Sequence, residues 1–257
     1  MLLAIDVGNT NITLGVYDGE SLKMTARIAT ESKSTADCYA VTLKNIIELK
    51  GLKVSDIDGA IIGSVVPAVG SMLVGAIEEA CGISPIVLGP GVKTGINIVI
   101  DNPGQLGADL AAGAAAALAH YDMPCIIFDL GTATTASVMD KNGAFLGGAI
   151  AAGLYTTLNA LTSNTAALPG ISIEPPKKVI GSNTVDSMRS GLIFGAASMI
   201  DGMIERIEEE LGEKATVIAT GGLSSVIVPL CKRDIICDDD LLLEGLRLIY
   251  NRNRKKN

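Results

Sequence analysis

Residues 2–17 read LLAIDVGNTNITLGVY, and residues 126–139 read IIFDLGTATTASVM. Each stretch is an apolar run, then a polar turn with an aspartate, a glycine and hydroxyl side chains, then a second apolar run. Two apolar runs around a short polar turn predict a β-hairpin. The leading aspartates, Asp6 and Asp129, lie 123 residues apart, close to half of the 257-residue chain. This repetition predicts two lobes of similar build.

Outside the two hairpins, strand-like and helix-like patterns alternate. The expected helices are residues 35–49, 68–80, 106–120, 184–211 and 239–250, and further expected strands are residues 60–67, 85–88 and 216–219. Thr35 is the expected N-cap of the first helix. Strands that alternate with helices indicate the α/β class. We divide the chain into an N-terminal lobe, residues 1–118, and a C-terminal lobe, residues 119–257.

The composition excludes several classes of protein. With 48% apolar and 19% charged residues, the chain is far from the composition of disordered proteins and long enough for a sizeable core. A net charge of −8 disfavours nonspecific nucleic-acid binding, which needs clustered basic residues. The basic residues near the end of the chain are expected to form a solvated tail: Arg252, Arg254, Lys255 and Lys256.

Neither a membrane segment nor a secretion signal is expected. The longest uncharged stretch, residues 142–173, is interrupted by Gly, Thr, Asn, Ser and Pro, and it lacks the roughly 20 apolar residues of a membrane helix. The opening Met-Leu-Leu-Ala-Ile-Asp has no basic flank and no small-residue cleavage site. We therefore expect a cytoplasmic protein.

The cysteines and the histidine offer little chemistry. Five cysteines, an odd number without CxxC spacing, argue against a disulfide framework and a zinc site. Cys125 begins an apolar run and is expected in the core. His120 is the sole histidine, so any Ser/His triad must use it, and it is expected to be exposed near a helix C-terminus.

Three glycine-containing turns follow apolar runs and suit phosphate binding. Residues 6–13 and 129–135 combine glycine, which lets backbone N–H groups approach phosphate, with hydroxyl and amide donors and a cation-binding aspartate. Thr220-Gly221-Gly222 lets a flat ring or a phosphate approach the backbone. Each turn alone is as well explained by an ordinary hairpin or helix-start turn, whereas the recurrence favours phosphate. None matches the P-loop or the G-x-G-x-x-G fingerprint.

These turns occur within a longer series of motifs that resembles a known family. The series is Asp6-Val7-Gly8-Asn9-Thr10, Gly107-Ala108-Asp109, Asp129-Leu130-Gly131-Thr132-Ala133-Thr134, Gly147-Gly148-Ala149-Ile150, Ile180-Gly181-Ser182-Asn183-Thr184 and Thr220-Gly221-Gly222, closed by residues 240–246. In order and extent it is similar to the type III pantothenate kinases. The resemblance implies the acetate and sugar kinase/Hsp70/actin fold, with two ribonuclease-H-like lobes of mixed sheets flanked by helices and ATP in the cleft. It also implies ATP-dependent phosphorylation of pantothenate to 4′-phosphopantothenate, the first step of coenzyme A biosynthesis.

The resemblance also implies roles for individual residues. The residues expected at ATP are Asp6, Val7, Gly8, Asn9, Thr10, Asn11, Ile12, Thr13 and Thr132, joined on the turn argument above by Gly221 and Gly222. Asp6 is expected to act through Mg²⁺, and Asp129 to bind a monovalent cation, K⁺ or NH₄⁺. Asp109 corresponds to the proton acceptor, although it also suits a simple helix-start charge. The pantothenate site corresponds to Gly107, Ala108, Asp109, Leu110 and Thr184, with Thr184 reaching across from the partner subunit of a homodimer.

Three positions depart from the family pattern, all on the acceptor side. Leu110 stands where arginine is usual, Ile100 where an aromatic residue, usually tyrosine, precedes the D-x-P segment, and Ala152 where proline is usual. The phosphate turns are intact, so we expect retained ATP binding and altered acceptor recognition, unless another basic side chain replaces the missing arginine. Two alternatives remain at this point: a divergent kinase for another small alcohol, and a nucleotide-binding regulatory protein without kinase activity.

Overall fold

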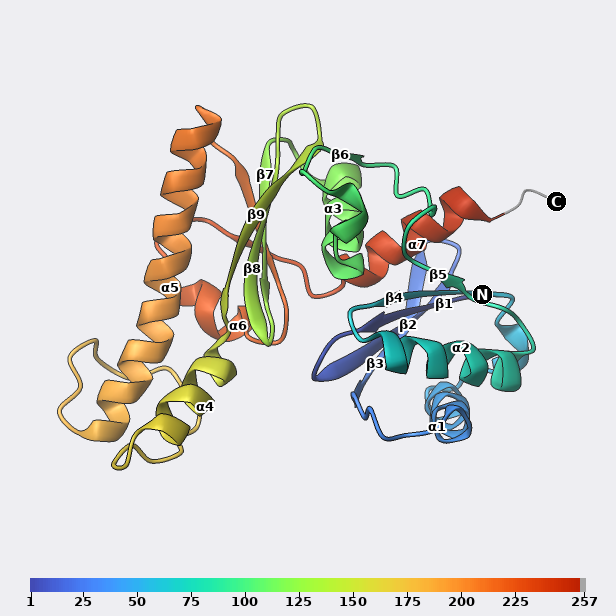
Figure 1. Ribbon diagram of the computed structural model, residues 1–257, viewed down its shortest axis with the longest axis horizontal. Helices are drawn as coiled ribbons and strands as arrows, with labels where there is room; N and C mark the ends of the chain where they lie inside the picture. Colours follow the sequence, from blue (N-terminus) through green and yellow to red (C-terminus); the bar gives the residue numbers. More distant parts are fainter. Residues whose placement is uncertain (255–257) are drawn as a thin grey trace. The chain divides into compact units, whose positions relative to one another are not determined.

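The computed structural model describes residues 1–254 and divides into two compact units, which are treated one at a time (Figure 1). Unit 1 consists of Met1–Ile96, Asp101–Ala119 and the segment that begins at Asp240. Unit 2 consists of Asn97–Ile100 and His120–Asp239. The change of unit after Ala119 lies beside the division expected after residue 118. The end of the chain differs from that division, because its last helix packs in unit 1.

Unit 1 is built on a five-stranded mixed sheet. Its strands are β1 (Leu2–Val7), β2 (Asn11–Asp18), β3 (Ser21–Ala29), β4 (Gly59–Ser64) and β5 (Ile86–Val87). The order across the sheet is β3-β2-β1-β4-β5. β1, β2 and β3 are antiparallel neighbours, whereas β4 and β5 run parallel to β1. The expected hairpin at the N-terminus is therefore confirmed and extended by a third strand.

Helices cover both faces of this sheet (Figure 1). They are α1 (Ala36–Leu49), α2 (Pro67–Cys81), α3 (Ala108–His120) and α7 (Leu241–Asn253). Because side chains alternate along a strand, β1 sends Leu3 and Ile5 into the core with α1 and α2, and Leu2 and Ala4 into the core with α3 and α7. The alanines of α3 allow a close approach by α7, whose Gly245 lies against the backbone of Ala112 with no room for a side chain.

Unit 2 repeats this plan. Its strands are β6 (Asn97–Ile98), β7 (Cys125–Leu130), β8 (Ala133–Met139), β9 (Ala144–Ala152), β10 (Thr216–Thr220) and β11 (Ile236–Cys237). Their order is β11-β10-β7-β8-β9-β6. Read from β9 to β11, the order and the strand directions equal those from β3 to β5 in unit 1. The duplication expected from the two hairpins is confirmed.

One face of the unit 2 sheet carries the helices α4 (Leu154–Asn164), α5 (Thr184–Leu211) and α6 (Ser224–Ile227). Their apolar side chains form one core with Ile126, Phe128 and Leu130 of β7. The opposite face receives the alternate residues of β7, Ile127 and Asp129. Asp129 therefore lies away from the helix-covered core.

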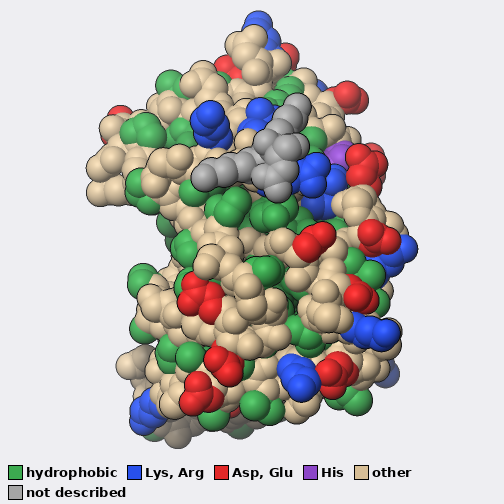
Figure 2. Space-filling model, turned by 90° about the vertical axis from the view of Figure 1, so that its right-hand side faces the viewer, with side chains coloured by type: hydrophobic (Ala, Val, Ile, Leu, Met, Phe, Trp, Pro, Cys, Tyr) green, Lys and Arg blue, Asp and Glu red, His purple; other side chains and the backbone are tan. Residues whose placement is uncertain are grey.

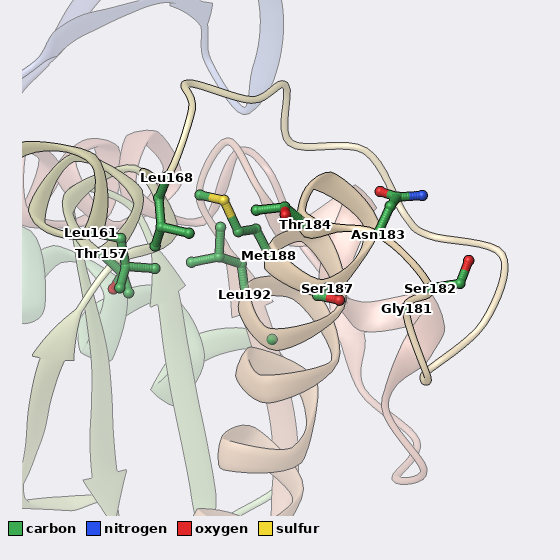
Figure 3. Close-up of a pocket in the computed structure, with 11 residues that line it drawn as sticks. Thr157, Leu161, Leu168, Gly181, Ser182, Asn183, Thr184, Ser187, Met188 and Leu192 are labelled. Carbon is green, nitrogen blue, oxygen red and sulfur yellow. The ribbon is translucent and has the colours of Figure 1, made fainter. Parts of the chain in front are cut away.

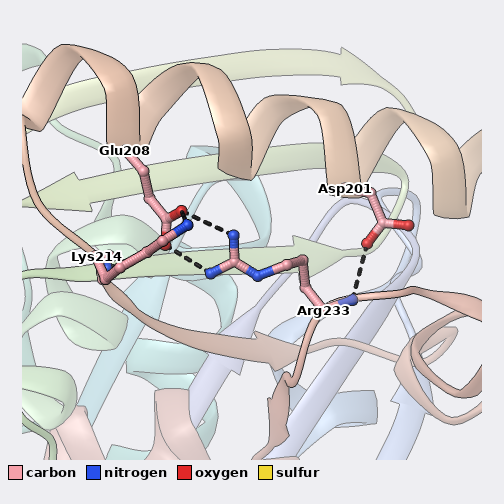
Figure 4. Close-up of polar contacts among 5 residues, drawn as sticks. Asp201, Glu208, Lys214 and Arg233 are labelled. Atoms are coloured by element: carbon pink, nitrogen blue, oxygen red, sulfur yellow. Dashed lines mark hydrogen bonds and ion pairs between the residues drawn. The ribbon is translucent and has the colours of Figure 1, made fainter.

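A buried carboxylate ties α5 to two other segments of unit 2 (Figure 4). Glu208 accepts hydrogen bonds from both terminal nitrogens of Arg233 at 2.7 and 2.6 Å, and from Lys214 Nζ at 2.7 Å. The Glu208 side chain is only 5% exposed. Asp201, two turns earlier in α5, accepts from the Arg233 backbone N–H at 3.2 Å. These contacts fix the connections on both sides of β10.

Most expected elements are confirmed, with shifts at their ends. The helix expected over 184–211 has those bounds, and Thr35 caps α1 by accepting from the Cys38 N–H. The helix expected from residue 106 begins at Ala108, after a short 3₁₀ turn over Pro103–Gln105. His120 is exposed and Cys125 is buried, as expected.

The surface carries charged side chains of both signs (Figure 2). On the face in Figure 2, acidic and basic side chains are interspersed with hydrophobic and uncharged ones. No helix among residues 1–254 has both the length and the apolar character that a membrane crossing demands. Of the expected basic tail, Arg252 lies in the last turn of α7, and Lys255 and Lys256 lie outside the described residues.

Candidate functional site

The first aspartate turn lies at the end of the central strand of unit 1. Asp6, half-buried, is paired with Thr13 on β2 and with Gly63 on β4. The Gly8 N–H donates to the Asn11 carbonyl at 2.9 Å, which closes the turn. A side chain at Gly8 would come within 3.1 Å of that same carbonyl oxygen, so the tight turn favours glycine.

Thr30, just beyond β3, anchors this turn. Its hydroxyl donates to the Gly8 carbonyl at 2.7 Å, and its N–H donates to the Thr10 carbonyl at 2.9 Å. The carbonyl groups of the turn are thus held by the protein, while the side chains of Asn9, Thr10 and Asn11 are exposed. These side chains present amide and hydroxyl donors of the kind that bind phosphate oxygens. Thr30 carries no sequence signal that identifies this role.

Asp109 lies in the first turn of α3, in the same unit as Asp6. Ala108 lies over Gly63, since a side chain built on Gly63 would come within 3.7 Å of the Ala108 Cβ. Gly63 is the β4 residue paired with Asp6, so unit 1 brings the start of α3 next to the Asp6 turn. The structure therefore brings together two predicted site segments that are about a hundred residues apart in sequence.

The surroundings of Asp109 favour a carboxyl group that can take up a proton. Burial raises its pKa above the usual 3.8, and hydrogen bonds from backbone N–H groups, including Leu110 N at 2.8 Å, oppose the rise. The side chain folds back against Gly107, where a Cβ would collide with Asp109 Oδ1. The presence of glycine at position 107 is thus explained by the lack of space for a side chain beside Asp109. A raised pKa brings the carboxyl closer to the range in which it serves as a base.

The second aspartate turn occupies the equivalent place in unit 2. Asp129 on β7 is paired with Thr135 on β8 and with Thr220 on β10. Gly221, the next residue, has φ +93°, a left-handed conformation that favours glycine. A Cβ atom at position 221 would lie only 2.5 Å from Asp129 Oδ1 and 2.7 Å from Leu130 N. The predicted cation residue and the predicted Thr-Gly-Gly turn are therefore in direct contact.

Two residues absent from the predicted site hold Thr132 in this turn. The Gly153 N–H and the Thr156 hydroxyl both donate to the Thr132 carbonyl, at 3.1 and 2.7 Å. A side chain at Gly153 would overlap the carbonyl oxygens of Gly131 and Thr132. Gly153 lies three residues beyond the Gly147-Gly148-Ala149-Ile150 motif, which was the nearest sequence signal. Thr156 had none.

Two further residues fix the Gly221 turn. The Ser224 N–H and hydroxyl lie 3.1 and 2.8 Å from the Gly221 carbonyl, and the hydroxyl also lies 3.2 Å from Asp239 Oδ1. Ser224 is 2% exposed. Asp239 directly precedes the closing motif at 240–246, and the family resemblance implied no role for Asp239. Both residues were missed by sequence reasoning.

Thr184 lies elsewhere in unit 2, at the first residue of α5. Asn183 caps the helix by accepting from the Asp186 N–H at 2.9 Å, and Thr184 itself is exposed. A cavity of about 750 Å³ opens beside it, between α4, α5 and the segment that precedes α5 (Figure 3). Its apolar side is formed by Leu161, Leu168, Met188 and Leu192.

The three positions that depart from the family pattern are distributed over both units. Leu110 is half-buried in the first turn of α3 in unit 1. Ile100 is half-buried in unit 2, where it lies next to Gly147 of β9, and Ala152 is exposed at the end of β9. Ile100 and Ala152 therefore flank the same strand.

Residues 1–254 contain no group of three or more His, Cys, Asp and Glu side chains that forms a metal site by itself.

The chain is similar over most of its length to proteins of one family. A family model described as type III pantothenate kinase matches residues 2–206. The type III pantothenate kinase of Exiguobacterium sibiricum is 45% identical over 254 residues, covering 99% of this chain and 100% of the relative.

Solved structures extend the comparison to the fold. A conserved Baf family protein from Campylobacter jejuni covers 98% of both chains at 18% identity, with a TM-score of 0.63. The activator of the 2-hydroxyisocaproyl-CoA dehydratase from Clostridium difficile, with bound ADPNP, covers 100% of this chain and 98% of its own at 13% identity, with a TM-score of 0.55. With the equal strand order of the two sheets, these likenesses confirm the expected acetate and sugar kinase/Hsp70/actin fold.

Proposed function

The chain belongs to the type III pantothenate kinase family, and from this premise we propose how its residues carry out the ATP-dependent phosphorylation of pantothenate, the first step of coenzyme A biosynthesis. The observation that carries the proposal is the family match over residues 2–206, which includes Asp6, Asp109, Asp129 and Thr184. ATP and a divalent metal ion are the cofactors of such a kinase.

In this proposal the turn from Asp6 to Thr13 binds phosphates of ATP. The exposed side chains of Asn9, Thr10 and Asn11 donate to phosphate oxygens, and Asp6 holds Mg²⁺ through the nucleotide. Mg²⁺, when bound, neutralises charge on the phosphates during transfer. The bonds from Thr30 to the Gly8 and Thr10 carbonyls support this role because they fix the turn in advance.

Asp109 is the proposed proton acceptor for the primary hydroxyl of pantothenate. Its carboxylate would orient that hydroxyl and take its proton as the bond to phosphorus forms. The raised pKa of Asp109 supports the assignment, and so does the position of Ala108 over the strand residue paired with Asp6.

Asp129 is the proposed ligand of a monovalent cation, K⁺ or NH₄⁺. Thr132, Gly221 and Gly222 are proposed at the nucleotide, beside this ion. The residues present fit a cation: glycine at position 221 avoids a Cβ that would lie 2.5 Å from Asp129 Oδ1, and the buried Thr135 hydroxyl across the sheet makes no hydrogen bond to any described residue. The cation, when bound, supplies positive charge next to the phosphates.

The acceptor pocket is proposed to contain Gly107, Ala108 and Leu110 from one subunit and Thr184 from the partner of a homodimer. The exposed position of Thr184 beside a cavity supports an assignment to ligand binding. In this proposal Leu110 leaves the substrate carboxylate without the guanidinium that the family resemblance leads us to expect there.

An ADP-release assay tests this proposal. We expect turnover with ATP and pantothenate, and Asp109→Asn should lower kcat by about a hundredfold or more because the variant cannot accept the proton. Asp37→Asn makes the same change at an exposed first-turn aspartate of α1 and should leave kcat unchanged. Wild-type kcat in Asp109→Asn would exclude its role.

The pH profile gives an independent check of the same residue. The pKa of Asp109 is raised in the folded protein, so on acidification it loses its charge at a higher pH than an ordinary aspartate, whose pKa is 3.8. The acid limb of kcat/KM should therefore lie above that value.

Turnover on pantetheine without turnover on pantothenate would overturn the acceptor assignment.

A further inference from the structure

Thr135 is the described residue whose hydroxyl oxygen is buried without a hydrogen-bond partner. Buried hydroxyl groups nearly always have a hydrogen-bond partner. A hydroxyl that is buried without one loses the hydrogen bonds that it makes to water in the unfolded chain. Such an atom in a folded protein indicates a water molecule or an ion that contacts it. The position of Thr135 in the sheet shows which of these the surroundings favour.

Thr135 faces the same side of the unit 2 sheet as Asp129. The two residues are directly paired across the antiparallel strands β7 and β8, and such partners point to one face with Cβ atoms about 5 Å apart. Their side chains make no hydrogen bond to each other. The two oxygens are thus neighbours with enough separation for a third group to touch both.

The other groups around Asp129 also favour a positive ion. Thr220, the β10 partner of Asp129, shares this face, and a side chain at Gly221 would come within 2.5 Å of Asp129 Oδ1. A carboxylate attracts a cation, and hard cations take several oxygen ligands, hydroxyl and carbonyl oxygens included. A hydroxyl that presents a lone pair to the ion would satisfy its buried oxygen.

We propose that the Thr135 hydroxyl supplies a second protein oxygen to the monovalent cation at Asp129. The inference rests on the cation role of Asp129 in the proposed function and extends it to a residue outside the predicted site. It also explains a threonine at this point of the strand, where valine would fill the same volume and leave no hydroxyl to satisfy.

Thermal unfolding tests the inference without measuring turnover. The protein is melted with a fixed concentration of a non-hydrolysable ATP analogue and Mg²⁺ while KCl replaces choline chloride at constant ionic strength. Wild type, Thr135→Val, Thr135→Ser and Asp129→Asn are compared. Thr135→Val conserves shape and removes the hydroxyl, whereas Thr135→Ser keeps the hydroxyl and is the matched control.

The melting temperature of the wild type should rise with KCl. That of Thr135→Ser should rise at a similar KCl concentration. Thr135→Val should need about tenfold more KCl for half of the gain, since one oxygen ligand is lost. In choline chloride alone Thr135→Val should melt no lower than wild type, because removing an unpartnered hydroxyl carries little penalty. Asp129→Asn should lose the KCl response.

The inference is overturned if the melting temperature of Thr135→Val rises with KCl as that of the wild type does. It is also overturned if Thr135→Val and Thr135→Ser lose equal stability in both KCl and choline chloride. If KCl stabilises the wild type and Asp129→Asn removes the effect while Thr135→Val does not, the cation role of Asp129 stands and that of Thr135 fails. If KCl has no effect on the wild type, both cation assignments fail. The kinase activity is decided separately by ADP release.

Discussion

Leu110 stands where the family resemblance leads us to expect an arginine. It follows the proposed proton acceptor directly and is half-buried in the first turn of α3. Leu110→Arg should lower KM for pantothenate about ten- to a hundredfold, because a charge-assisted bond from arginine to a carboxylate contributes about 1.5–3 kcal/mol. Steady-state kinetics with varied pantothenate measure the change.

Pantetheine provides the control for Leu110→Arg, because its chain ends in a thiol and carries no carboxylate. Its KM should stay near the wild-type value in the same variant. Leu110→Met changes the shape without adding charge and should leave KM for pantothenate within about twofold. An arginine variant with unchanged KM for pantothenate would contradict the proposal that the carboxylate approaches position 110.

At the scale of single residues, the sequence suggests candidate chemical groups but not the residues that hold them in place. Asp6, Asp129 and Gly221 stand out because turns with the same residue types recur after apolar runs, and Asp109 stands out through the family resemblance. Thr30, Thr156 and Ser224 act through hydrogen bonds to distant carbonyls, and nothing in their local sequence records those partners. Supports of this kind appear only once the strands have been paired.

The short element α6 links the Gly221 turn to the segment after β11. Ser224→Ala removes the hydroxyl that lies 2.8 Å from the Gly221 carbonyl and 3.2 Å from Asp239 Oδ1. We expect KM for ATP to rise about five- to tenfold, since a buried hydrogen bond contributes about 1 kcal/mol. KM for pantothenate should change little, because Ser224 holds the turn that we propose binds the nucleotide.

Ser225→Ala is the matched control, an identical change at an exposed neighbour in the same element. Both variants are melted as well as assayed. If Ser224→Ala raised both KM values equally, or lowered only the melting temperature, Ser224 would stabilise the unit without positioning the nucleotide turn.

The longest helix, α5, is held by the Glu208 cluster, which makes stability depend on acidity. Hydrogen bonds from Arg233 lower the pKa of Glu208 from 4.5 to about 2 in the folded protein, with help from Lys214. The carboxylate therefore contributes stability that is fully present above the unfolded-state pKa and is lost as pH falls through about 2. The shift corresponds to about 3 kcal/mol.

Glu208→Gln should lower the free energy of unfolding at neutral pH by about 2–3 kcal/mol, because Arg233 and Lys214 lose their anion. The difference from wild type should shrink between pH 5 and pH 2 as the wild-type carboxylate is protonated. Urea unfolding over that pH range measures it. Glu209→Gln changes an exposed neighbour and serves as the control, and a loss of equal size there would contradict the role of the buried cluster.

Whether an element was predicted depended on how plainly its residues alternate. Strand β3 carries polar residues on its solvent face, and β9 is rich in Gly and Ala, so neither shows a strong apolar pattern. Helix α4 has no charged residues to mark a solvent face. By contrast, α5 has an N-cap asparagine and a glycine with φ +75° at its C-cap, and its bounds could be predicted.

At the scale of the whole molecule, the homodimer remains a prediction. Val179 and Ile180 are exposed at 64% and 87%, close in sequence to Thr184, and large apolar side chains with such exposure favour a protein partner. Light scattering should give twice the chain mass of 26.4 kDa at micromolar concentration. Ile180→Glu should shift the protein toward monomer and raise KM for pantothenate.

Leu49→Glu is the control for Ile180→Glu, because Leu49 is equally prominent, at 84% exposure, at the end of α1. It should leave the mass unchanged. A wild-type monomer that turns over pantothenate at a normal rate would contradict the proposal that Thr184 acts on the partner subunit's site.

The repeated hairpins were enough to predict two similar sheets, because each hairpin fixes the centre of its sheet. The membership of the units could not be predicted in the same way. Residues 97–100 pair with β9 in unit 2, and α7 packs with β1 and β4 in unit 1, through long-range contacts that leave no local pattern.

This arrangement affects the order in which the protein can fold during translation. Leu243, Leu246 and Ile249 are at most 2% exposed and complete the core over Leu2 and Ala4, yet they leave the ribosome after all the other residues of that core. Unit 2 has all its residues once position 239 has emerged, whereas unit 1 waits for α7. N-terminal domains generally fold first during synthesis. Here the half of the sequence that is made first is the half whose core closes last, so a stalled nascent chain would expose the apolar face of β1.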